Sequence, residues 1–166
     1  MFNLNDAVVY ASYGVCIITA IEKRDFSGEN IEYYILHPVN DQKNTFYVPT
    51  SNSSLTQKMR SVFSRKEAEE LIKLMPDEKF VWIDNEIQRK EAYRKIIENG
   101  SRRELVKLIK SLYIHKKILA ENHKHLHSAD EHFLQEAENM LYEELAYALD
   151  IPKNNVVSYI CSQVDT

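Results

Sequence analysis

The hydrophobic pattern of the chain changes its period once, near Ser64, and this change constrains the fold more than any single motif. Before Ser64, short apolar runs rich in β-branched residues alternate with turn-forming residues, which is typical of strands. After it, apolar residues recur about every three or four positions, as on amphipathic helices. We therefore predict an α+β protein, with a β-rich domain over residues 1–62 and a helical domain over residues 63–166.

The β-rich segment carries a series of strand signals, of which the last is the weakest: 7–10, 15–21, 31–36, 45–48 and 55–62. Gly14 suits the turn between the first two strands, because glycine adopts positive φ without strain. The near-continuous apolarity of 31–36 predicts a central strand. Short strands joined by tight turns predict a small twisted sheet or partial barrel.

Three stretches have the spacing of a capping box and predict helix starts: Ser64–Glu67, Ser101–Glu104 and Ser128–Glu131. Another helix is expected to begin at Asp84 or Asn85 and to end before Gly100, which suits a left-handed C-terminal position. Residues 76–79 interrupt the first helical pattern and are a candidate linker between the two domains. An apolar patch that includes Phe80 follows them.

Composition restricts the class of protein. With 44% hydrophobic residues and ten tyrosines, the chain of 166 residues has enough apolar surface for a folded core. No apolar run approaches the roughly 20 residues of a membrane helix, and the first residues lack the regions of a signal peptide. We expect a cytoplasmic protein without a membrane partner, in which Cys16 and Cys161 are small buried side chains.

Charge is unevenly distributed along the chain. Residues 86–126 carry 11 Lys and Arg against 5 Asp and Glu, whereas residues 127–166 carry 1 against 8. A basic segment between acidic flanks suggests a face that meets phosphate, and ordinary solvated helix surface is the alternative. Arg89 falls close to the apolar stripe of its helix, where packing would fix its guanidinium. The basic candidates are Arg89, Lys90, Arg94, Lys95, Arg102, Arg103, Lys107 and Lys110.

Signals for catalysis are weak. The three glycines form neither a phosphate-binding loop nor a dinucleotide fingerprint, and no nucleophile elbow or metalloprotease motif occurs. His123, His125 and His127 are the one metal-like cluster, but no carboxylate or cysteine lies at convincing ligand spacing. We expect no enzyme, no cofactor and no metal site, and keep a small metal-dependent enzyme as an alternative.

Several segments together resemble one family, the CarD family of bacterial transcription regulators, which also supplies the polymerase-interacting module of transcription-repair coupling factors. The chain looks most like the Firmicute-type members. The order and spacing of these segments are more specific than any one of them. The resemblance runs, in chain order, through Asn5–Tyr10, Gly14, Ile21–Glu22, Gly28, Tyr33–Leu36, Val48–Pro49, Gly100, Leu112–Lys117 and Leu126–Ala146.

The resemblance implies a Tudor-like β-domain that binds the β subunit of RNA polymerase and a helical domain that meets promoter DNA with weak sequence specificity. Through both, the protein would modulate the stability of the open complex. A monomer is expected, and a dimer through the exposed sheet edge is left open. The implied polymerase-binding residues are Arg24, Tyr47 and Pro49. The implied DNA-binding residues are Trp82, Arg89, Lys90, Arg94 and Lys95.

Two positions depart from the family pattern. Better-studied members insert a tryptophan into the minor groove from about fourteen residues before the equivalent of Gly100, whereas Trp82 lies eighteen residues before it. Glu86 takes the family's place, so Trp82 is either a displaced wedge or a packing residue. Tyr47 stands where some members have a polymerase-contacting arginine. These departures keep open a second hypothesis, a polymerase-binding or other protein-interaction adaptor without DNA contact.

Overall fold

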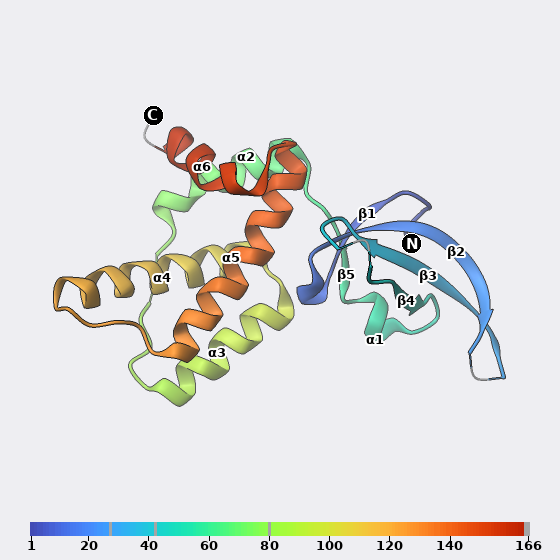
Figure 1. Cartoon of the computed structure of the whole chain (residues 1–166), viewed down its shortest axis with the longest axis horizontal. Coiled ribbons are helices and arrows are strands. Elements are labelled where there is room, and N and C mark those ends of the chain that lie inside the picture. The colour runs from blue at the N-terminus through green and yellow to red at the C-terminus, as the bar shows by residue number, and fades with distance from the viewer. Residues whose placement is uncertain (27, 42, 80, 165–166) are drawn as a thin grey trace. The chain divides into compact units, whose positions relative to one another are not determined.

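The computed structural model describes residues 1–26, 28–41, 43–79 and 81–164, which form two compact units (Figure 1). The first unit spans Met1–Phe63 and contains the strands, and the second begins at Ser64 and contains the long helices. The α+β architecture predicted from the sequence is confirmed. Ser27 and Gln42, which belong to the expected turns, and Phe80 lie outside the described residues.

The strands of the first unit form an open five-stranded antiparallel sheet in the order β4-β3-β2-β1-β5. Within the described residues, β4 and β5 are the two edges, so the sheet does not close into a barrel. β3 lies between β4 and β2, so it is an interior strand of the sheet. The prediction of a central position is accurate only to that extent, because the middle strand of the five is β2. The strands are β1 (Ala7–Tyr10), β2 (Val15–Asp25), β3 (Asn30–Pro38), β4 (Phe46–Pro49) and β5 (Met59–Ser61).

The predicted fifth strand over 55–62 is too long. A short helix, α1 (Ser53–Thr56), takes its first part, because the side chain of Asn52 accepts a hydrogen bond from the Leu55 amide and caps the turn. Only Met59–Ser61 pairs with β1. Gly14 follows the single turn η1 (Ala11–Tyr13) with φ of 85°, as the sequence predicts.

One face of the sheet is the core of the first unit. Its buried residues come from all five strands: Val8, Tyr10, Cys16, Ile18, Tyr34, Leu36, Val48 and Met59. A β-bulge between Ile18 and Ala20 shifts the register of β2 against β3, so that Ala20 pairs with Ile35. After the bulge, residues of β2 with even numbers lie on the outer face of the sheet.

In the second unit α5 contacts each of the other long helices. The core between α3, α4 and α5 is built from Tyr93, Ile97, Leu105, Leu108, Leu112, Leu134, Ala137 and Met140. No helix over the described ranges is long and apolar enough to cross a membrane. The helical elements are α2 (Arg65–Leu74), η2 (Met75–Asp77), α3 (Glu86–Asn99), α4 (Arg102–Glu121), α5 (Ser128–Leu149), η3 (Lys153–Asn155) and α6 (Val156–Val164).

The predicted helix starts are correct, but only one of the three capping boxes forms. Ser64 and Glu67 bond reciprocally, with the Ser64 amide donating to the Glu67 carboxylate over 2.7 Å. Ser101 caps α4 by position alone, and His127 takes the cap of α5. The carboxylates meant to close those boxes pair with lysines instead: Glu104 with Lys107 and Glu131 with Lys116. Asn85 caps α3, and Gly100 ends it in the left-handed region.

Two smaller predictions are wrong. Residues 76–79 are no linker between the units, because they belong to the second unit and are bound to α4. The Lys110 ammonium donates to the carbonyls of Met75, Pro76 and Glu78, which holds the segment against the helix. Cys16 is buried as predicted, but Cys161 on α6 is exposed.

The unequal caps give a matched test of helix stability. Ser64→Ala removes both hydroxyl contacts of a formed capping box and should lower the free energy of unfolding by about 1 kcal/mol. Ser101→Ala removes no cap hydrogen bond and should change it by less than about 0.5 kcal/mol. Urea unfolding of the full chain, followed by helical circular dichroism, measures both. Equal losses from the two substitutions would contradict the assignment of the caps.

Candidate functional site

The outer face of the sheet brings together the three residues that the sequence proposes for polymerase binding. Arg24 pairs with Ile31, Tyr33 with Pro49, and Ile35 with Tyr47. Residues in register point to the same side of a sheet, and alternate residues share that side. Arg24, Tyr47 and Pro49 therefore lie on the face opposite the core of the unit.

An aromatic patch, formed by Phe26, Tyr33 and Tyr47, occupies this face. Phe26 meets Tyr33 edge to face at 5.3 Å between ring centroids and meets Tyr47 in the same way at 5.2 Å. Phe26 is 60% exposed and Tyr47 is 45% exposed, whereas Tyr33 is buried beneath them. The sequence pattern did not identify Phe26, because this residue follows β2 in a turn. The one signal that could have identified it is a large apolar side chain at a turn position.

Arg24 lies at the polar end of the same face. Its guanidinium pairs with the Glu22 carboxylate at 2.7 Å, and both side chains are about half exposed, 49% and 47%. An exposed pair of this kind contributes little stability, about 0–1 kcal/mol, so it can be exchanged for a partner's carboxylate. The face thus combines aromatic area with one replaceable cationic contact.

Arg89, a predicted DNA-binding residue, is buried inside the second unit. Its Nε and Nη2 donate to the two carboxylate oxygens of Asp130 at 3.1 and 2.9 Å, and its Nη1 donates to the carbonyls of Ile83 and Asp84. The side chains are 4% and 2% exposed. The hydrogen bonds to Asp130 raise the pKa of Arg89 against the effect of burial. This guanidinium joins α3, α5 and the segment before α3.

Trp82 also packs within the second unit. Its ring stacks on His115, with 3.5 Å between centroids and 13° between planes, and the Arg89 guanidinium carbon lies 4.5 Å from the indole centroid. The indole packs against the helical core. Burial, followed by the nearby Arg89 charge, lowers the pKa of His115, which favours the neutral imidazole against the indole.

Most of the basic segment is neutralised within its own unit. Arg102 pairs with the buried Glu144 at 2.7 Å, Arg103 pairs with the buried Glu78, and Lys107 pairs with Glu104. The ammonium of Lys110 is bound by the three carbonyls named above. These side chains serve the packing of the unit, so their positive charges do not add up to one phosphate-binding face.

The solvent side of α3 keeps the remaining three predicted DNA-binding residues, Lys90, Arg94 and Lys95, which we call the basic side of α3. Lys90 pairs with Glu86 and Lys95 with Glu91, each one turn apart on exposed surface. Arg94 is exposed and has no ion pair among the described residues. The hydrogen bond from Lys90 lowers the pKa of Glu86, so this carboxylate stays ionised beside them.

Two exposed apolar side chains accompany the basic side of α3, and sequence analysis gave neither a role. Ile87 is 78% exposed, and it precedes Lys90 and Arg94 by about one and two helical turns on the same stripe. Val81, in the segment before α3, is 79% exposed. Their exposure was the missing information, since the sequence pattern alone does not tell an outward isoleucine from an inward one.

The histidine cluster does not form a metal site within the described part of the chain. His123, His125 and His127 lie exposed between α4 and α5 or at the start of α5. No group of three or more potential ligands among the described residues could hold an ion.

Two candidate binding surfaces follow from the contacts described above: the aromatic patch with Arg24, and the basic side of α3.

Comparison with protein families identifies both units. Residues 2–62 match the model of the CarD-like/TRCF RID domain, and residues 70–161 match the model of the CarD C-terminal domain. The chain belongs to the CarD family. Membership makes it a transcription-related regulator of the RNA polymerase-binding class, from a family of regulatory proteins. Comparison with curated proteins finds no match. Its place among the Firmicute-type CarD members stays a prediction.

The buried pair of this CarD-family chain gives a stability prediction. Arg89→Met leaves the Asp130 carboxylate buried without its partner and should destabilise the helical unit by about 3–5 kcal/mol. The double variant Arg89→Met/Asp130→Leu removes both charges and should regain most of that loss. Arg94→Met, on the exposed side of the same helix, is the control and should be nearly neutral. Urea unfolding measures all three, and a single variant as stable as the control would refute the structural role of Arg89.

Proposed function

We propose that the chain binds the β subunit of RNA polymerase through the outer face of its first unit and contacts promoter DNA through the basic side of α3. Binding at both places would modulate the stability of the open complex. The observation that carries the proposal is the aromatic patch beside Arg24 on the unit that matches the CarD-like/TRCF RID domain. The protein would act as an RNA polymerase-binding regulator with weak DNA sequence specificity.

The chemistry of the outer face supports a protein partner. Tyrosine and arginine are enriched among the residues that dominate protein interfaces, because they bring large area or charge-assisted hydrogen bonds. Phe26 and Tyr47 would bury their exposed ring area, and Arg24 would exchange Glu22 for a carboxylate of the β subunit. Pro49 ends the edge strand β4, whose outer backbone groups can also pair with an extended strand. Sheet face and sheet edge remain the two modes of this proposal.

The basic side of α3 supports contact with the DNA backbone. Arg94 is the cation available for a phosphate, and Lys90 and Lys95 can exchange exposed intrahelical partners for phosphate at small cost. Ile87 lies on the same stripe and can supply an apolar contact at a distorted base step. We assign Arg89 and Trp82 positioning roles, since their polar and stacking groups are engaged inside the unit.

The adaptor without DNA contact is favoured by a different observation. Arg102, Arg103, Lys107 and Lys110 are all engaged with carboxylates or carbonyls of their own unit. The positive potential is thereby smaller than the sequence count suggests. The adaptor would keep the polymerase contact and lack any dependence on the basic side of α3.

Polymerase binding is tested by reversing one charge on the outer face. Arg24→Glu should weaken capture of the isolated polymerase β-subunit lobe by at least about tenfold, because it places a carboxylate beside Glu22 where a cation is needed. Lys23→Glu is the matched control, since Lys23 is exposed and its register with Glu32 places it on the opposite face. Equal capture of wild type and Arg24→Glu, or no capture of wild type, would reject the proposed contact.

DNA contact is tested on the polymerase-bound protein. Arg94→Glu should reduce the change in open-complex lifetime that the wild-type protein causes. It should also lower the salt dependence of that change by about one phosphate contact. Lys66→Glu on α2, which also reverses an exposed cation on a helix surface, is the control. If Arg94→Glu keeps the full wild-type effect while Arg24→Glu abolishes it, the adaptor is correct and the DNA contact is not.

A further inference from the structure

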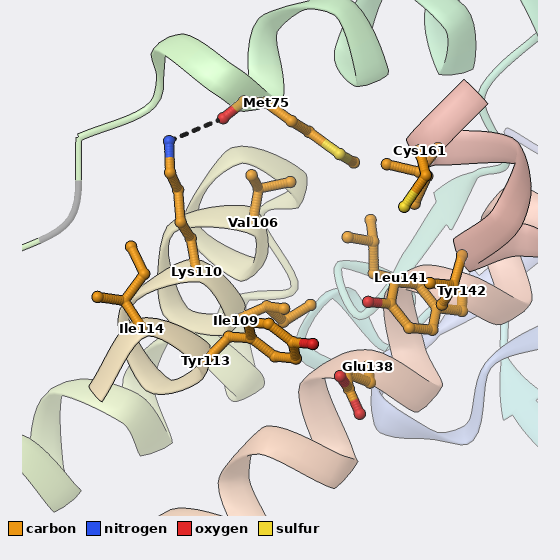
Figure 2. A pocket seen from close by; sticks show the side chains of 12 residues that line it. Met75, Val106, Ile109, Lys110, Tyr113, Ile114, Glu138, Leu141, Tyr142 and Cys161 are labelled. Carbon is orange, nitrogen blue, oxygen red and sulfur yellow. Dashed lines mark hydrogen bonds between the residues drawn. The ribbon is translucent and has the colours of Figure 1, made fainter. Parts of the chain in front are cut away.

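The second unit contains an apolar pocket that is lined by elements other than those of the aromatic patch and the basic side of α3. It has a volume of about 410 Å³ and lies between η2, α4, α5 and α6 (Figure 2). Its walls come mainly from the aliphatic residues Val106, Ile109, Leu141, Val157 and Ile160. A cavity of this size and lining is typical of sites for small organic molecules.

Lys110 does not make the pocket suitable for an anion. Its aliphatic stem lines the pocket, but its ammonium donates to the carbonyls of Met75, Pro76 and Glu78 at 3.1, 2.7 and 2.7 Å. Figure 2 shows the amine turned to the Met75 carbonyl, away from the tyrosines of the pocket. A ligand carboxylate or phosphate would have to compete with three bonds that anchor the η2 segment.

A carboxylate instead supplies the unused charge of the pocket. Glu138 lines it and has no hydrogen bond or ion pair in the part of the chain that the structure describes. Burial raises the pKa of Glu138, with Lys116 opposing the rise, as expected for a carboxylate that has lost water without gaining a direct partner. Figure 2 shows Glu138 near the rings of Tyr113 and Tyr142, which also line the pocket.

The tyrosines at this end of the pocket are suited to a cation. Burial, followed by Glu138, raises the pKa of Tyr142 to about 12, so its hydroxyl stays neutral at physiological pH. Tyr113 is largely exposed and borders the same space. A neutral phenol accepts a hydrogen bond from an ammonium group, and its ring face attracts a positive charge.

We propose that this pocket binds a small amphiphilic amine, with its apolar body among the aliphatic residues and its protonated amine against Glu138. The amine satisfies the unpaired carboxylate, and the apolar body displaces water from walls that offer it few polar partners. The pocket shares no residue with the aromatic patch or the basic side of α3, so the site is independent of the proposed function.

Three ligands with one eight-carbon chain test the charge preference: octylamine, octanol and octanoate. The full chain is titrated with each, and binding is followed by NMR of the methyl groups that line the pocket. Octylamine should bind at least about tenfold more tightly than octanoate, the effect of one charge-assisted contact, with octanol between them. Glu138→Gln should remove the preference for the amine and preserve octanol binding. Glu136→Gln, on the same helix but outside the pocket lining, should change neither.

Chemical modification of Cys161 provides a second test, in which the wild-type protein itself is blocked. It is an exposed thiol in the pocket lining, whereas Cys16 is buried, so a bulky maleimide should modify Cys161 selectively. Maleimide treatment should abolish binding of all three ligands to the wild type, because the adduct fills the pocket. The same treatment should leave binding to Cys161→Ser intact. Equal affinities for amine and carboxylate, shifts outside the pocket, or amine preference retained in Glu138→Gln would each overturn the proposal.

Discussion

The ion pair between Arg89 and Asp130 is the interaction on which the helical unit depends. It lies almost without solvent between α3 and α5, and the same guanidinium fixes the carbonyls of Ile83 and Asp84 before α3 begins. A buried guanidinium requires hydrogen-bond acceptors for its N–H groups, because a donor that has lost water and gained no acceptor raises the free energy of the folded state. The pair therefore sets where α3 starts relative to α5, and with it the position of Trp82 and of the basic side of α3.

Burial, more than charge count, decides what each basic residue does. The sequence places 11 basic residues in 41 positions, which resembles a phosphate-binding surface. In the structure Arg89, Arg102 and Arg103 neutralise carboxylates that are nearly inaccessible to solvent. Arg94, five positions after Arg89 on the same helix, faces water. One helix thus carries a structural arginine on one side and a candidate binding arginine on the other.

Regular local signals were predictable from the sequence, and competition between side chains was not. The change of period at Ser64, the stop at Gly100 and the positive φ of Gly14 follow from single-residue preferences and were correct. The capping boxes at Ser101 and Ser128 do not form because Glu104 and Glu131 form ion pairs with lysines instead. Glu104 pairs with Lys107 on its own helix, whereas Glu131 of α5 pairs with Lys116 of α4. The spacing within one helix contains no information about such a distant partner.

The candidate site shows the same division. Family resemblance assigned Arg24, Tyr47 and Pro49, and the register of the sheet placed them on one face. Phe26 joined them only in three dimensions, through its contacts with Tyr33 and Tyr47. Helical periodicity alone suggested that Arg89 lies near the core, but it did not reveal Asp130, which is 41 positions away. Contacts between distant segments are where sequence reasoning ends.

The bulge in β2 has a consequence for how members of the family are compared. An uninterrupted register from the Ile18–Leu36 pair would bring Lys23, and not Arg24, opposite Ile31. The extra residue therefore exchanges which of two adjacent cations points away from the core. A relative that lacks this residue would present the preceding position to a partner even where the aligned letters agree. Equivalence along this strand is defined by pairing across the sheet, and column-by-column identity of the sequences is an unreliable guide to it.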